Sequence, residues 1–143
     1  MSAYSTNVTQ FRDKELLLCA LSEMGFDASM VEVNETAQQL FDYHGRATTY
    51  TDMEGDKAEI IIRRQYVGSS SNDLGFRKTA NGTYEAIISA FDRRSHSYDE
   101  SWVGKLSASY ARHGLIQKAS KQGLRHAGNV QKNGKTEMLF VKA

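Results

Sequence analysis

The feature that most constrains the fold of this chain is a pair of Asn–Gly dipeptides, Asn81–Gly82 and Asn133–Gly134. The first dipeptide lies between two β-rich flanks in the stretch 73–91, and the second lies at the centre of the stretch 124–142. Both residues of an Asn–Gly pair tolerate the positive φ angles that a two-residue hairpin turn requires. The sequence therefore predicts two β-hairpins, and with them antiparallel strand pairing in the second half of the chain.

Other strands are indicated before the first hairpin. The stretch AYSTNVTQF (3–11) is rich in β-branched and aromatic residues, and 29–35 also has strand character, whereas 36–43 carries no clear pattern. The strongest strand pattern is AEIIIRRQYV (58–67), because three successive isoleucines suggest burial on both faces of a sheet. The polar stretches 69–72 and 92–101 are expected to be loops.

Two helices are predicted from apolar positions that recur at helical spacing. Asp13 is a suitable N-cap for the first helix, which Gly25 ends. The second helix is longer and can be capped by Asp99 or Ser101. Its apolar arc consists of Trp102, Leu106, Tyr110 and His113.

These elements predict a single domain, residues 1–143, of the α+β class. We expect an antiparallel or mixed sheet of about six to seven strands with two helices packed on one face. A chain of 143 residues has the usual size of one domain and can bury roughly 68–70% of the surface that its unfolded form exposes.

The sequence contains no apolar run of membrane-spanning length, and its first residues lack the pattern of a signal peptide. We therefore expect a cytoplasmic protein without a membrane partner. Cys19 is the one cysteine in the sequence, so no internal disulfide can form. Its place inside the first predicted helix favours a role in the core over that of a nucleophile, which needs a nearby base.

Charge is distributed unevenly along the chain, although the formal net charge is only +1. Residues 1–60 carry four basic and eleven acidic side chains, a net −7, whereas the remaining residues carry 14 basic and six acidic side chains, a net +8. This difference can produce a bipolar surface. If the two halves interleave within one domain, the charges instead mix.

Two basic pairs on predicted strands, Arg63–Arg64 and Arg77–Lys78, are candidate anion-binding residues. Adjacent residues on a strand point to opposite faces, so one member of each pair could align with one of the other to form a basic stripe. Tyr66, Phe76 and Tyr84 could then stack on nucleic-acid bases. The alternative is that these cations protect sheet edges and keep one face soluble.

A second candidate cluster, Tyr110, Arg112 and His113, lies on the second predicted helix. Tyr110 and His113 share the apolar arc, which favours an ordinary amphipathic helix with polar tips that reach partners. A contact with a protein or an anion through the three residues is the alternative. Acid–base chemistry would also need a second group within hydrogen-bond reach and a pocket.

No catalytic or cofactor motif accompanies these candidates. The four histidines are scattered without metal-ligand spacing, and neither a phosphate-binding glycine loop nor a nucleophile elbow is present. We therefore expect no metal and no cofactor, and no catalytic residue is assigned. Whether the protein is an enzyme stays open at this point, and a non-catalytic role is favoured.

Four stretches carry a resemblance to a known family: YSTNVTQFRDKELLLCALSEMGF (4–26), DLGFRKTANGTYEAI (73–87), SYARHGLIQKASKQG (109–123) and KNGKTEMLFVK (132–142). They are spread along most of the length of the chain and are similar to the conserved chloroplast and cyanobacterial reading frame 35 proteins, also classed as uncharacterised domain family 1257. That resemblance implies a fold but supplies no active site. Family members look like companions of ring-shaped ATPases, which implies an accessory or adaptor role.

Two functions are therefore expected. The first is a non-catalytic accessory protein that binds another macromolecule, either a ring-type ATPase or its own copies through an exposed strand edge. The alternative is a protein that binds an anionic ligand, nucleic acid or a small nucleotide, through a basic surface made by the sheet and the helix.

Overall fold

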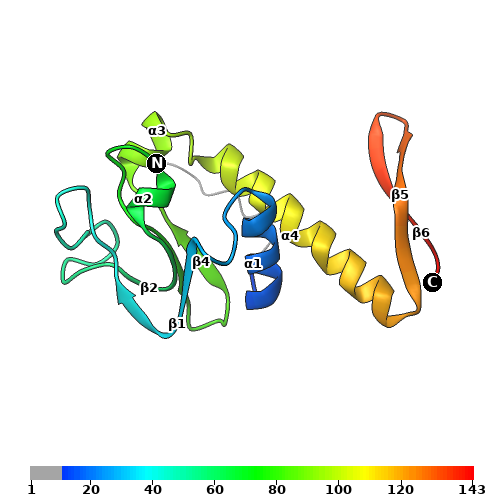
Figure 1. The fold of residues 1–143 in the computed structure, drawn as a ribbon, viewed down its shortest axis with the longest axis horizontal. Coiled ribbons are helices and arrows are strands. Elements are labelled where there is room, and N and C mark those ends of the chain that lie inside the picture. Colours follow the sequence, from blue (N-terminus) through cyan, green and yellow to red (C-terminus); the bar gives the residue numbers. More distant parts are fainter. Residues whose placement is uncertain (1–10) are drawn as a thin grey trace. The chain divides into compact units, whose positions relative to one another are not determined.

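The computed structural model describes residues 11–143 and contains four helices and six strands within them (Figure 1). The helices are α1 (Lys14–Glu23), α2 (Arg64–Val67), α3 (Ala90–Ser95) and α4 (Glu100–Lys121). The strands are β1 (Val31–Gln39), β2 (Lys57–Ile62), β3 (Leu74–Lys78), β4 (Tyr84–Ile87), β5 (Leu124–Lys132) and β6 (Lys135–Lys142). The protein thus belongs to the α+β class. No helix in this part of the chain has both the length and the apolar character needed to cross a membrane.

The first four strands form one antiparallel sheet in the order β1-β2-β3-β4. Asn81–Gly82 lies in the turn between β3 and β4, and Gly82 has a φ of +79°, which confirms the first predicted hairpin. The predicted strand 3–11 falls outside the described residues except for Phe11. This residue forms an isolated antiparallel bridge with Tyr84 of β4.

Both faces of β2 are buried, as the run of isoleucines predicts. Ile60 and Ile62 lie opposite Phe76 and Leu74 of β3 and belong to the larger core, which also contains Leu17 and Leu21 of α1 and Leu106 and Tyr110 of α4. Ile61 faces the other way, in a smaller core with Leu40, Ala58 and Ile87. The helices α1 and α4 therefore contribute to the core on the same face of this sheet.

The prediction of one sheet of six to seven strands is wrong. The second Asn–Gly hairpin, β5–β6, forms a separate two-stranded sheet, because in residues 11–143 its strands pair only with each other. The chain also divides after Tyr110 into two compact units, and the hairpin belongs to the second. The Asn–Gly signal correctly fixed the local pairing, but a turn carries no information about which sheet its strands join.

Two local predictions also need correction. The predicted strand 58–67 ends at Ile62, and Arg64 begins the short helix α2, because the Asp73 carboxylate accepts a hydrogen bond from the Arg64 backbone N–H at 2.8 Å. The predicted loop 92–101 contains most of α3, whose N-cap is Ser89. Its hydroxyl accepts from the Asp92 N–H at 3.1 Å.

The caps of the two predicted helices are confirmed. Asp13 accepts a hydrogen bond from the Leu16 N–H at 3.1 Å, and Asp99 accepts one from the Trp102 N–H at the same distance. Cys19, however, is exposed, which contradicts the expected core role. It is two residues from buried Leu17, about 200° around the helix, and therefore points away from the core.

Candidate functional site

The loops at the end of β2 and the start of β3 meet at a buried carboxylate, Asp73. One of its oxygens accepts from the Phe41 N–H at 2.8 Å and from the Arg63 guanidinium at 2.9 Å, and the other accepts from the Arg64 N–H. Arg63 also forms an ion pair with Glu32 at 2.7 Å. Asp73 therefore ties loop 40–50 to the end of β2.

Hydrogen bonds and ion pairing favour the charged forms of Glu32 and Arg63. Partial burial opposes the ionisation of Glu32, but hydrogen bonds from Arg63 and Asn34 outweigh it and hold the pKa of Glu32 below its usual value. Burial opposes charge on Arg63 as well, yet its hydrogen bonds with Glu32 and Asp73 raise the pKa of this guanidinium. Arg63 is thus neutralised by two acids and serves chiefly to hold the loops together.

A second buried network continues from the adjacent residue, Asn72. Its side-chain oxygen accepts from the Tyr43 N–H at 3.0 Å, and its side-chain nitrogen donates to the Ser89 hydroxyl at 2.9 Å. Ser89 in turn donates to the Asp92 carboxylate at 2.7 Å. Loop 40–50, the turn before β3 and the start of α3 are therefore held together by buried polar side chains.

The structure separates the two basic pairs that the sequence suggested might align. Arg63 and Arg64 follow the end of β2, where Ile62 pairs with Leu74 at the start of β3. Arg77 and Lys78 lie at the far end of β3, opposite Glu85 and Tyr84 of β4. Arg77 forms an ion pair with Glu85, while Lys78 is exposed. The four cations therefore do not form one stripe across the sheet.

Tyr110 has a structural contact in this fold. Its ring packs edge-to-face on Phe11 at a centroid distance of 5.2 Å and is 8% exposed. Its hydroxyl oxygen accepts hydrogen bonds from the Arg12 and Asp13 N–H groups at 3.0 and 2.8 Å. Tyr110 thereby fixes the start of α1, in agreement with the amphipathic-helix interpretation.

Arg112 and His113 lie in the second compact unit, on the other side of the division from Tyr110. Both side chains are partly buried, and both make contacts within the protein. Tyr110 thus belongs to the unit that contains the four-stranded sheet, whereas Arg112 and His113 belong to the C-terminal unit.

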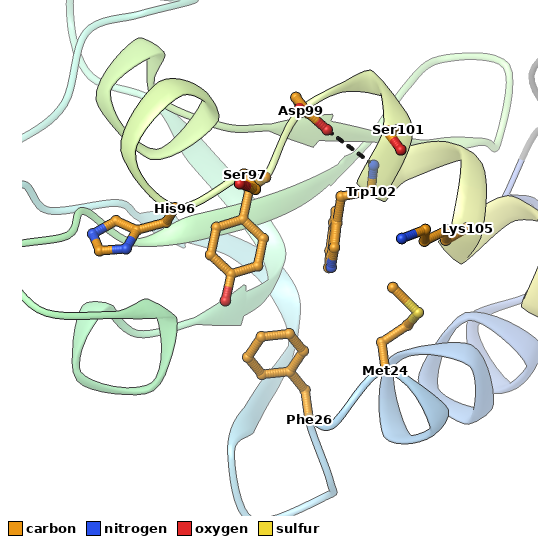
Figure 2. Close-up of a pocket in the computed structure, with 9 residues that line it drawn as sticks. Met24, Phe26, His96, Ser97, Asp99, Ser101, Trp102 and Lys105 are labelled. Atoms are coloured by element: carbon orange, nitrogen blue, oxygen red, sulfur yellow. Dashed lines mark hydrogen bonds between the residues drawn. The ribbon is translucent and has the colours of Figure 1, made fainter.

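An open hollow of about 510 Å³ lies between the end of α1, the loop after α3 and the start of α4 (Figure 2). Phe26, Tyr98 and Trp102 form its aromatic wall, with ring centroids 5.1–6.4 Å apart. Because these rings contact one another, they form a packed wall and not a cage with room for a cation between them. Met24 and Lys105 complete the side shown on the right of Figure 2.

The polar groups around this hollow are mostly engaged by the fold. Asp99 caps α4, and the Tyr98 hydroxyl donates to the Val67 carbonyl at 2.9 Å. Burial, with a smaller contribution from Asp92, raises the pKa of Tyr98. Within residues 11–143, no group of three or more His, Cys, Asp or Glu side chains is placed to hold a metal ion. The hollow thus offers an apolar wall flanked by Lys105.

The C-terminal hairpin exposes apolar side chains on a two-stranded sheet. Val130 pairs with Glu137, and Leu139 pairs with Gly128, so Val130 and Leu139 share one face. They are 44% and 45% exposed. On the other face, the Phe140 ring contacts His126 at a centroid distance of 5.6 Å. The hairpin thus leaves apolar side chains exposed on a sheet of only two strands.

Comparison with known proteins agrees with the resemblance noted in the sequence. A family model described as "Protein of unknown function (DUF1257)" matches residues 20–139, which is most of the chain. The protein belongs to the DUF1257 family. No curated protein and no solved structure matched the chain significantly.

In this DUF1257 protein, the sequence identified Arg63 and Arg64 but missed the residues that position them. Asn72 and Asp73 were placed in or beside a polar loop, although both are buried. A signal was present, because Asp73 directly precedes Leu74, Gly75 and Phe76, the buried start of β3, where a charged side chain must find partners if it is buried. Loop 40–50 carries no periodic pattern, so its pairing with this segment could not be predicted.

Proposed function

We propose that this DUF1257 protein is a non-catalytic accessory protein that binds another protein through the C-terminal hairpin β5–β6. The observation that carries the proposal is the exposure of apolar Val130 and Leu139 on a sheet of only two strands. A two-stranded hairpin without further packing is at best marginally stable in water. A partner that adds a strand would cover apolar area and extend the backbone pairing.

Strand addition is the binding mode that this hairpin supports best. In residues 11–143, neither outer edge of β5–β6 is paired with a further strand, so backbone N–H and C=O groups can accept an extended segment. The alternating side chains of both strands would then select the partner, since apolar groups occupy both faces. Backbone hydrogen bonds to the added strand would provide affinity, and contacts of the Val130 and Leu139 side chains would provide specificity.

The charge of the hairpin indicates the chemistry of the partner. Between residues 124 and 142 there are four basic side chains and one acidic side chain, Glu137, which gives a net +3. The basic side chains are Arg125, Lys132, Lys135 and Lys142. An acidic segment would therefore associate faster and more selectively than a basic one. A ring-type ATPase, which the family resemblance implies, is the first partner to examine, and a second copy of this chain is the next.

The proposal is tested by charge substitutions on the hairpin. Proteins captured from the native cells by the wild-type chain are purified, and their affinities are measured by calorimetry against wild type and the double variant V130K/L139K. A ring ATPase from the same cells and the chain itself, by light scattering, are measured in parallel. We expect the double variant to bind at least about tenfold more weakly, because two apolar contacts of an interface are lost.

Met53→Lys is the matched control, because Met53 is 94% exposed and lies far along the sequence from the hairpin. It introduces one lysine on an exposed apolar residue, as each substitution of the double variant does, and should leave the affinity unchanged. Equal affinities for wild type and V130K/L139K would contradict the proposal. So would the absence of any reproducible partner together with monomeric behaviour.

A further inference from the structure

Among the described residues, the exposed aromatic side chains are concentrated in the loop 41–50 and in the short helices α2 and α3, the segments that Asn72 and Asp73 connect. Within residues 11–143, five aromatic residues are at least 40% exposed: Phe41, Tyr43, Tyr50, Tyr66 and Phe91. Three of them belong to segment 41–50, one to α2 and one to α3. Large flat side chains are costly to leave in water, so a group of five in neighbouring loops indicates a binding surface.

Buried hydrogen bonds fix these loops to one another. Asp73 binds the backbone of Phe41 and of Arg64, and Asn72 binds the backbone of Tyr43 and the side chain of Ser89. Ser89 is the N-cap of α3, the helix that carries Phe91. The backbone N–H of Tyr50 donates to the carboxylate of buried Asp56 at 2.6 Å. The rings are therefore held on a preorganised framework, which reduces the entropy lost on binding.

Positive charge accompanies these rings. Two of the nearby acids are buried, and a third, Asp42, accepts hydrogen bonds from the backbone N–H groups of His44 and Arg46. The guanidinium carbon of Arg64 lies 5.8 Å from the ring centroid of Tyr43. Arg64 is exposed and has no carboxylate within ion-pair distance among the described residues. Arg94, also exposed, lies three positions after Phe91 on α3 and so on the same side of that helix. By contrast, Asp73 and Asp92 are 4% and 1% exposed.

We propose that this arginine–aromatic surface, formed by Arg64, Arg94 and the five exposed rings, binds single-stranded nucleic acid. Phosphates would contact the arginines, and bases would stack on the rings, as in proteins that bind single strands without strong sequence preference. The proposal is separate from protein binding by the hairpin, because it uses residues of the first compact unit alone.

The arrangement favours a single strand over a duplex or a mononucleotide. The flat faces of bases are available for stacking in a single strand, whereas a duplex hides them between neighbouring base pairs. A mononucleotide would occupy one ring and one cation, but the rings here come from three separate segments. Each stacked base contributes independently, so the affinity should rise with the length of the strand.

The test is fluorescence anisotropy with labelled oligothymidine and oligouridine of about 15 nucleotides, titrated with the purified full chain at low salt. Tyr43→Ala should weaken binding by at least about fivefold, since it removes one stacking platform. Tyr43→Phe retains the ring and should bind like wild type. Arg64→Ala should weaken binding and also reduce the slope of log affinity against log salt by about 0.7.

Lys78→Ala is the matched cation control. Lys78 is exposed like Arg64 but lies at the other end of β3, so its removal should change affinity by less than about twofold. L139K should likewise leave nucleic-acid binding unchanged, which separates this proposal from the one on the hairpin. Thermal unfolding of each variant verifies that the fold is retained.

Three results would overturn the inference. The first is the absence of saturable binding to either oligonucleotide at about 50 mM salt, where phosphate contacts are strong. The second is equal weakening by Tyr43→Ala and Lys78→Ala, which would indicate general charge attraction. The third is tighter binding of a duplex or of mononucleotides. Loss of a captured protein in Tyr43→Ala without any oligonucleotide binding would assign the surface to a protein partner instead.

Discussion

The guanidinium of Arg63 donates to the carboxylate of Asp73 across 2.9 Å, and the Asp73 side chain is only 3% exposed. The same carboxylate also accepts from two backbone N–H groups, those of Phe41 and Arg64. One buried acid therefore satisfies three donors from two segments that are distant in the sequence. This relationship makes Asp73 the residue on which the geometry of the loops most depends.

Replacing Asp73 with asparagine should destabilise the protein by about 2–3 kcal/mol, because half-buried Arg63 loses a charge partner and one N–H loses its acceptor. Urea unfolding followed by circular dichroism measures this change. Glu85→Gln is the control, since it breaks the exposed ion pair with Arg77 and should cost only about 0–1 kcal/mol. Similar losses in the two variants would show that Asp73 has no special role.

Stability should decrease in acid through Asp56, which is fully buried. Burial opposes its ionisation, but hydrogen bonds from Thr51 and Tyr50 outweigh this effect and hold the pKa of Asp56 below its usual value. Because the folded pKa is depressed, the stabilisation is present above the unfolded pKa of about 3.9 and is lost as the pH falls through the folded value.

Asp56→Asn should therefore be less stable than wild type near neutral pH, by about 1–3 kcal/mol. The difference between the two proteins should shrink as the pH is lowered from about 5 to below the folded pKa. Urea unfolding at several pH values tests this expectation. A difference that stays constant over the whole range would refute the assigned role of the carboxylate.

Two glycines should respond to alanine in opposite ways. A Cβ atom at Gly75 would lie 2.8 Å from the Ala58 Cβ and 2.9 Å from a methyl group of Leu40, so Gly75→Ala should cost about 1–3 kcal/mol through overpacking. At Gly104, within α4, a Cβ meets no atom within 4 Å. Gly104→Ala should stabilise by about 0.5–1 kcal/mol, because alanine favours the helix. Thermal melts of the two variants should shift in opposite directions.

Tyr110→Phe separates a structural role from ligand binding. The variant keeps the ring contact with Phe11 but leaves the Arg12 and Asp13 N–H groups without their acceptor, which should cost about 1–3 kcal/mol. Oligonucleotide affinity should not change, because Tyr110 lies outside the proposed surface. A fully stable variant with weakened binding would reverse this assignment.

Sequence patterns predicted the elements whose signals are local. The Asn–Gly pairs, the isoleucine run and the capping aspartates all act through neighbours along the chain, and each is found where predicted. The separation of β5–β6 from the main sheet was not predicted, because strand partners are chosen by tertiary packing. Helix α2 was not predicted either, because it begins where the Asp73 carboxylate accepts a hydrogen bond from the Arg64 N–H, a tertiary contact.

The candidate site was predicted only in part. Arg63 and Arg64 were identified as basic residues, but not their different roles. Arg63 binds Asp73, 10 residues away in the sequence, and Glu32, 31 residues away. One arginine is neutralised by these acids, and its neighbour lies over Tyr43 instead. Such differences between adjacent residues depend on tertiary contacts, so no periodic pattern in the sequence predicts them.

The most direct test of the account is hydrogen exchange of the hairpin amides, measured by mass spectrometry with and without the purified protein partner. If the partner adds a strand to β5–β6, exchange in residues 124–142 should slow markedly on binding, because edge N–H groups become hydrogen-bonded. Peptides from 31–39, the edge strand β1, serve as the internal comparison and should exchange at the same rate in both samples. Unchanged exchange in 124–142 with a saturating partner would contradict the central claim.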